Sequence, residues 1–260
     1  MLSPPVIVLT LLLIAILFFI FYKRPKKKIN LPINYKELLV YHVAFYRGLK
    51  EENKIKFEEK LKDFLRYVHI EGVNTDVSEL DKLLVASGAV IPTFGFLKWK
   101  YYNLNNVLLY PETFNREEFL ASGFEKNTLG MVGSGAMQRV MILSKPALYV
   151  GFNNEVGKSN TAIHEFVHLL DKADGEVDGL PELLLSKQYK VEWNETVNKN
   201  IVMILNGESD INDYAATNKA EFFAVVSEYF FNNPDLFKTN HADMYDLMIK
   251  IFNQDPVQLE

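Results

Sequence analysis

The feature that most constrains this chain is an H-E-x-x-H motif within residues 161–171, whose sequence is TAIHEFVHLLD. Its two histidines, His164 and His168, are four residues apart, so a helix places both imidazoles on one face. Ser159 and Asn160, just upstream, are favourable N-cap residues for such a helix. Apolar residues fill most of the remaining positions: Ile163, Phe166, Val167, Leu169 and Leu170. The segment therefore predicts a buried helix with two imidazoles on the same side.

Glu165 follows the first histidine and completes a set of polar groups that is costly to bury without compensation. A Zn²⁺ ion held by His164 and His168 would compensate this set, and Glu165 would then lie where it can act as a general base toward water. The alternative is a structural helix in which the motif arises by chance. The apolar surroundings favour the metal site, and the arrangement is typical of zinc peptidases.

A catalytic zinc site usually has three protein ligands and one position for water, so the chain must supply a third ligand. None of the remaining histidines has a metal-ligand spacing: His42, His69 and His241. Glu221 and Glu228 are better candidates, because they lie seven residues apart on one face of an apolar helix predicted within residues 214–231, which Asn218 could cap. A carboxylate in such a place is expected to be paired or ligating. The spacing alone leaves both glutamates open.

Several stretches of the chain together resemble the MtfA family of zinc-dependent peptidases. They are HEFVHLLD at 164–171, DGLP at 178–181, YAATNKAEFFAVVSEYFF at 214–231, NQDP at 253–256 and VLLYP at 107–111. The resemblance covers most of the chain after about the first thirty residues. It implies a gluzincin-like site, in which two histidines and a glutamate of the E-F-F-A segment hold zinc. The site is also similar to that of the catalytic domain of anthrax lethal factor.

In that domain a tyrosine lies seven residues before the ligand glutamate, as Tyr214 lies before Glu221 here. The resemblance therefore favours Glu221 over Glu228 as the third ligand. It further implies that Tyr214 donates a hydrogen bond to the oxyanion formed when water attacks a peptide carbonyl, while Glu165 carries the proton. Asp171 and Glu228 are candidates to bind the outer ring nitrogens of the histidines.

Two stretches depart from the usual family pattern. A Gly-Glu-x-Trp segment is replaced within residues 133–140, and a Leu-Ser-Trp segment reads Leu-Ser-Lys at residues 143–145. Both changes spare the metal motif, so they bear on substrate preference and on the lining of the cleft.

The function that follows is zinc-dependent hydrolysis of a peptide or protein substrate, with aminopeptidase and endopeptidase action both open. A second possibility is a zinc-containing binding module that sequesters a regulatory protein, because members of the family are linked to binding a transcription repressor. A purely structural zinc site would need four closed ligands, and the chain has no cysteine. Imidazole and carboxylate ligands also suit other divalent ions.

Residues 6–22 form a run of 17 uncharged and mainly apolar residues, which as a helix would span roughly 25 Å. Five basic residues follow within 23–28 and none precedes the run, which is the reverse of a cleaved signal peptide. A buried core helix is disfavoured by Pro4 and the basic cluster. We expect a transmembrane anchor at 1–22, a basic linker at 23–33 and a metallopeptidase domain at 34–260. The positive-inside rule places the anchor in the inner (cytoplasmic) membrane with the domain facing the cytoplasm.

Charge argues against nucleic acid as a partner. The whole chain carries a formal net charge of −5, and the basic cluster alone contributes +5, which leaves −10 for the rest. A domain so acidic is not expected to bind nucleic acid. The basic cluster can still interact with anionic lipid headgroups.

The expected architecture is α+β and mostly helical: a zincin-like domain with a small sheet beside the H-E-x-x-H helix, preceded by one transmembrane helix. Helices are expected at 34–49, 51–68, 181–205 and 241–252, and a further one runs to residue 90 from a capping box formed by Asp76 and Glu79. Strands are expected at 107–110 and 139–143. Two positions stay open for the second strand: the edge of the sheet, where an extended peptide would pair with it, and the interior.

Overall fold

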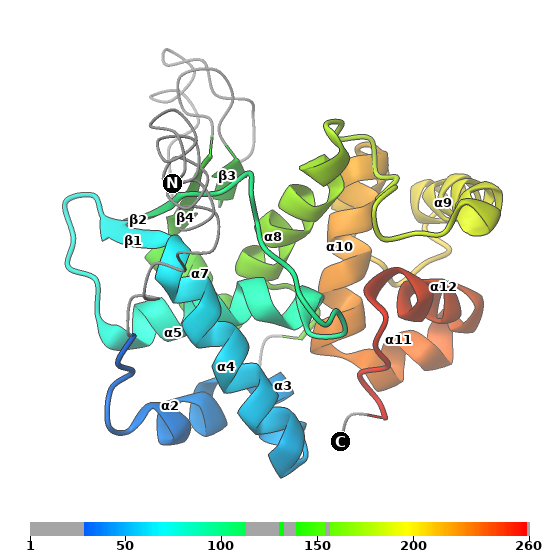
Figure 1. Ribbon diagram of the computed structural model, residues 1–260. Coiled ribbons are helices and arrows are strands. Elements are labelled where there is room, and N and C mark those ends of the chain that lie inside the picture. The colour runs from blue at the N-terminus through cyan, green and yellow to red at the C-terminus, as the bar shows by residue number, and fades with distance from the viewer. Residues whose placement is uncertain (1–28, 113–129, 133–138, 154–156, 259–260) are drawn as a thin grey trace, which may run out of the picture.

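The computed structural model describes residues 29–112, 130–132, 139–153 and 157–258 (Figure 1). The anchor expected at 1–22 and most of the basic linker lie outside these residues. Within the described part of the chain, no helix combines the length and the apolar character needed to cross a membrane. The described chain is mostly helical with one small sheet, which confirms the predicted α+β class.

The sheet has four strands in the order β1-β2-β4-β3, and their bounds are β1 (His69–Gly72), β2 (Asn106–Tyr110), β3 (Gly130–Val132) and β4 (Val140–Ser144). β2 pairs in parallel with both β1 and β4, whereas β3 runs antiparallel to β4. Both predicted strands are therefore present. Of the two positions left open for the strand near residues 139–143, the interior one is found, and β3 lies at the neighbouring edge of the sheet as far as it is described.

From residue 29 onward, three helices precede β1: α2 (Tyr35–His42), α3 (Ala44–Gly48) and α4 (Glu51–Tyr67). The single helix predicted over 34–49 is wrong, because the backbone of Val43 is extended and breaks it. The break allows the Val43 side chain to be buried, and it brings Tyr35 and Tyr46 to the same carboxylate. Both hydroxyls donate hydrogen bonds to the buried Glu58 of α4, at 2.6 and 2.8 Å. A local sequence pattern does not predict these bonds, because they join residues that lie far apart in the chain.

Helix α5 (Glu79–Val90) starts with a capping box that differs from the predicted one. The N-cap is Ser78, whose hydroxyl accepts a hydrogen bond from the Asp81 amide, while the Asp81 carboxylate accepts one from the Ser78 amide. Asp81 is fully buried and also lies 3.0 Å from the ammonium group of Lys145. Lys145 thus forms an ion pair between α5 and α7 (Lys145–Gly151).

Helix α8 (Thr161–Asp171) contacts β3, β4, α5 and α7, so the sheet lies beside the helix that carries the metal motif (Figure 1). On its other side it packs along α10 (Lys219–Asn232). The predicted helices 51–68 and 241–252 are confirmed as α4 and α12 (Ala242–Phe252). The helix predicted over 181–205 is too long, because residues 181–186 form turns and only α9 (Lys190–Leu205) is α-helical. Helix α11 (Pro234–Asn240) was not predicted.

Aromatic side chains hold α10 in the core. Phe222, Phe223 and Phe230 are completely buried, and the Phe252 ring of α12 stacks on Phe223 at 5.8 Å between ring centroids. Complete burial of one such side chain contributes about 1.5–3 kcal/mol. Helix α10 is therefore held firmly in the position from which its acidic residues reach α8.

Candidate metal centre

Helix α8 presents the two histidines of the motif on one face, as the sequence predicts. Asn160 is the N-cap, and its side-chain oxygen accepts a hydrogen bond from the Ile163 amide at 3.2 Å. The rings of His164 and His168 lie 4.7 Å apart between centroids. The apolar residues of the helix point into the core and are fully buried, so the imidazoles are left on the face toward α10.

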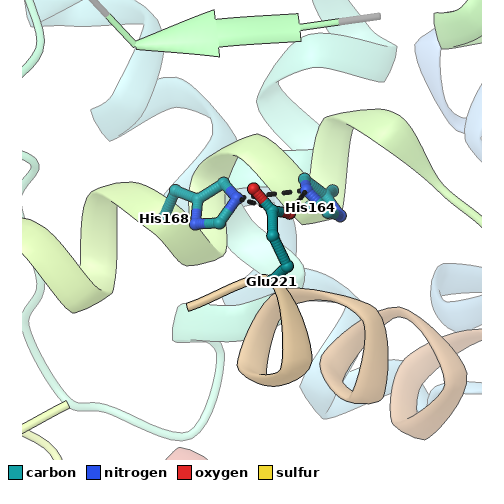
Figure 2. Close-up of side chains that lie close together, drawn as sticks. All are labelled: His164, His168 and Glu221. Carbon is teal, nitrogen blue, oxygen red and sulfur yellow. Dashed lines mark hydrogen bonds and ion pairs between the residues drawn. The ribbon is translucent and has the colours of Figure 1, made fainter. Parts of the chain in front are cut away.

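Helix α10 brings Glu221 to these imidazoles from the opposite side (Figure 2). Asn218 caps this helix, as predicted, by accepting a hydrogen bond from the Glu221 amide at 2.9 Å. One Glu221 oxygen, Oε2, lies 3.0 Å from His164 Nε2 and 3.3 Å from His168 Nε2. The two Nε2 atoms are 3.1 Å apart. Three ligand-type atoms from two helices therefore form a nearly equilateral triangle.

This triangle fits a tetrahedral metal ion. Ligand bonds of about 2.0–2.1 Å at a tetrahedral ion place neighbouring ligand atoms about 3.3 Å apart. The three measured separations, 3.0 to 3.3 Å, lie close to that value. Within the described chain, His164, His168 and Glu221 are the group of acidic and histidine side chains that could hold such an ion. The donor set of two imidazoles and one carboxylate leaves a fourth position for water.

Glu228 lies two helical turns beyond Glu221 and contacts the other side of the His164 ring. Its Oε1 is 2.6 Å from His164 Nδ1, and its Oε2 accepts hydrogen bonds from the Ser159 hydroxyl and the Asn160 amide. Burial lowers the pKa of His164, but the carboxylates of Glu228 and Glu221 outweigh this and raise the pKa well above its usual value. The Glu228 carboxylate holds the Nδ1 proton and so leaves the Nε2 lone pair available for a metal.

Glu165 is on the same helix and has a different environment. Its side chain is buried, and among the described residues none donates a hydrogen bond to its carboxylate. Burial is the main cause that raises its pKa, and the neighbouring histidines oppose the shift. A carboxylate with a raised pKa beside a metal site is suited to accept and return a proton.

The family model described as glucose-regulated metallo-peptidase M90 matches residues 21–253, which is most of the chain. The chain belongs to the M90 family of metallopeptidases. This confirms the resemblance to the MtfA family, and it agrees with a site built from two histidines and one glutamate.

Relatives of this M90 protein extend over most of its length. The protein slr2042 of Synechocystis is 28% identical over 271 residues, which cover 98% of each chain. Mlc titration factor A of Cronobacter sakazakii is 28% identical and covers 83% of this chain and 84% of its own. Mlc titration factor A of Serratia proteamaculans is 31% identical, over 59% of this chain and 61% of its own.

Tyr214, the other residue that the resemblance assigned to the M90 site, lies in a short 3-10 helix, η5 (Asp213–Ala216). Its ring centroid is 6.1 Å from that of His164, so the side chain is beside the candidate metal ligands. The loop before it is anchored at Asp210, which accepts hydrogen bonds from Lys158 and Tyr229. Burial raises the pKa of Asp210, but these bonds and others outweigh it and hold the pKa well below its usual range.

Asp171 was a candidate to bind the outer ring nitrogen of one of the histidines, and it does not. One of its oxygens accepts a hydrogen bond from the Gly179 amide at 2.9 Å, and His168 contributes only an electrostatic interaction. Burial, the largest cause, raises the pKa of Asp171 to about 6. The outer-nitrogen role is filled on His164 by Glu228 instead. Sequence reasoning missed the Gly179 contact because it joins a side chain to a backbone amide in a turn.

The three other histidines lie outside the cluster, as expected. His241 is 2.6 Å from Asp210, His42 packs edge-on against Tyr41, and His69 is exposed on β1. None of them contributes to the group formed by α8 and α10.

Replacing Glu228 with Gln is expected to weaken Zn²⁺ binding by roughly 10- to 100-fold, because outer partners of metal-bound histidines affect affinity on this scale. Gln keeps the shape and one oxygen acceptor but removes the charge that holds the Nδ1 proton. Competition with a chromophoric chelator measures the affinity, and circular dichroism checks the fold. Zinc affinity equal to that of the parent chain would show that Glu228 does not support His164.

Proposed function

We propose that this protein is a zinc-dependent peptidase that hydrolyses peptide bonds in a peptide or protein substrate. The observation that carries the proposal is the triangle formed by His164, His168 and Glu221, with separations that match a tetrahedral ion. Glu165, next to the first ligand, supplies a group of the kind that hydrolysis needs. Membership of a metallopeptidase family supports the same reaction class.

In this proposal, different residues of the chain have different roles in hydrolysis. A bound zinc ion would lower the pKa of water toward about 7 and polarise the peptide carbonyl. The water oxygen bonds to the carbonyl carbon, and the Glu165 carboxylate takes a proton from that water. It then gives that proton to the amine nitrogen as the C–N bond breaks. Glu228 keeps the His164 ring in the orientation that leaves Nε2 toward the metal.

Tyr214 is proposed to donate a hydrogen bond to the oxyanion that develops on the carbonyl oxygen. Its ring lies beside His164, and its hydroxyl is buried. Loss of one oxyanion donor typically lowers kcat by about 10²- to 10³-fold. Replacing Tyr214 with Phe is therefore expected to lower kcat by roughly that amount, with KM and zinc affinity nearly unchanged. Steady-state kinetics separate kcat from KM, and an unchanged kcat would remove Tyr214 from the mechanism.

An extended substrate could pair with β3, which forms one edge of the described sheet and contacts α8. Such pairing uses backbone hydrogen bonds and accepts many side chains. It does not distinguish an aminopeptidase from an endopeptidase.

The proposal includes the membrane anchor predicted from residues 1–22. The support is the apolar run followed directly by basic residues, which orients the domain toward the cytoplasm. Fractionation of cells that express the full chain, with carbonate extraction, tests this part separately. Release into the soluble fraction would contradict the anchor and leave the peptidase proposal untouched.

The direct test of the reaction is cleavage of a diverse peptide library by the full chain loaded with zinc. Cleavage that requires zinc is expected, and the cut positions distinguish removal of terminal residues from internal cleavage. Bound zinc without cleavage of any library member would contradict the peptidase proposal.

A second candidate function is sequestration of a regulatory protein. Several relatives carry the name Mlc titration factor A, which describes titration of a partner. By analogy, this chain could bind a transcription regulator. A partner captured equally well by the parent and by the Glu165→Gln variant, with no cleavage of that partner, would favour this function.

A further inference from the structure

Gly179 lies where three helices of the site meet. Its amide donates a hydrogen bond of 2.9 Å to the Asp171 carboxylate at the end of α8. Its carbonyl accepts one of 2.7 Å from the Trp193 indole of α9. Both bonds are buried, and the Trp193 side chain is completely inaccessible to solvent. The peptide groups on both sides of this glycine are thus fixed to two different helices.

The third helix is α10, and Gly179 touches its first turn. A Cβ atom at position 179 would lie 2.2 Å from the carbonyl oxygen of Lys219 and 2.9 Å from the Ala220 amide nitrogen. These are backbone atoms, so no side chain can rotate away to make room. The backbone of Gly179 is also left-handed, with φ of +76°, a conformation that glycine adopts without strain.

The contact points lie close to the metal ligands on both sides. Asp171 is three residues after His168 on α8, and Lys219 and Ala220 come directly before Glu221 on α10. Trp193 also packs on Phe222 and Phe223, immediately after Glu221. Gly179 therefore acts as a spacer between the helix that supplies two ligands and the helix that supplies the third.

We propose that Asp171, Gly179 and Trp193 form a positioning device, the Gly179 clamp, that sets the distance between Glu221 and the two histidines. None of the three touches a ligand atom, and their role is to fix the start of α10 against the end of α8. The inference rests on the metal site of the proposed function, but it concerns metal binding and not the hydrolysis step.

The test is Gly179→Ala in the full chain, with Gly207→Ala as the matched control. Gly207 has nearly the same backbone conformation, with φ of +72°, but an added Cβ there meets no atom within 4 Å. Both variants suffer the same backbone strain, and only Gly179→Ala forces α10 to move. We expect Gly179→Ala to weaken Zn²⁺ binding by at least about tenfold, and Gly207→Ala to bind like the parent chain.

Cobalt gives a second readout that a general loss of stability would not produce. Tetrahedral Co²⁺ has intense visible absorption bands, and these weaken when the ligand geometry opens. At saturating Co²⁺, the Gly179→Ala spectrum is expected to differ from those of the parent and of Gly207→Ala. Trp193→Phe keeps one aromatic ring at this position but removes the indole donor and part of the buried ring volume. It is expected to change affinity and spectrum in the same direction by a smaller amount.

Parental affinity and an unchanged cobalt spectrum in Gly179→Ala would overturn the clamp. If Gly179→Ala fails to fold, Trp193→Phe decides the question by the same two measurements. The proposed function fails in a different way: a parent chain that binds no divalent ion contradicts the metal site itself. A parent that binds zinc without cutting peptides contradicts the peptidase and still permits the clamp to be tested.

Discussion

Replacing Glu165 with Gln is expected to lower peptide-bond turnover by roughly 10²- to 10⁴-fold, the range that general acid–base groups contribute. Gln has nearly the same size and can occupy the same buried position, but it cannot accept a proton from water. Zinc affinity should stay at the parental value, because Glu165 is not part of the ligand triangle. Initial rates on the best library peptide and chelator competition measure the two quantities on the same preparations.

Glu195→Gln provides the matched control for this change. Glu195 is exposed on α9, so the same loss of charge there should leave both turnover and zinc affinity unchanged. Parental turnover in Glu165→Gln would remove the general base from the mechanism. Loss of zinc together with turnover would instead place Glu165 among the groups that hold the metal.

Local chemistry explains why α8 and α10 could be predicted closely from sequence. Asn160 and Asn218 each cap a helix by accepting a hydrogen bond from an amide three residues later, and each lies within a few residues of a predicted ligand, His164 or Glu221. The i, i+4 spacing then fixes the face that carries the histidines. The break at Val43 was missed because the contacts that accompany it, from Tyr35 and Tyr46 to the Glu58 carboxylate, involve a residue on another helix.

The spacing of the two glutamates on α10 is not sufficient to tell which of them is the third metal ligand. Glu221 and Glu228 lie on the same face, so sequence alone could assign either one to the metal. The structure places the His164 ring between them, with Nε2 toward Glu221 and Nδ1 toward Glu228. That assignment depends on how α10 is rotated and shifted against α8, which is set by packing between distant segments.

Adding Zn²⁺ at about 1,000 times its Kd is expected to stabilise the parent chain by about 4 kcal/mol, because zinc binds the folded site. For a domain of this size that corresponds to a rise in Tm of roughly 8–16 °C. His168→Ala removes one of the three ligand atoms, so this variant should lose most of the affinity and the zinc-dependent rise in Tm. Its zinc-dependent peptide cleavage should also disappear. Thermal unfolding with and without chelator measures the effect.

His69→Ala is the matched control, since His69 is exposed on β1 and lies outside the ligand group. It should keep the full zinc-dependent rise in Tm. Equal Tm values for the parent chain with zinc and with chelator would contradict a metal site made by these helices. A zinc-dependent rise that survived in His168→Ala but vanished in His69→Ala would assign the ion to a different place. The expected pattern requires His168 to hold the ion that both stabilises the fold and serves the chemistry, because only then does the loss of this one imidazole abolish both effects.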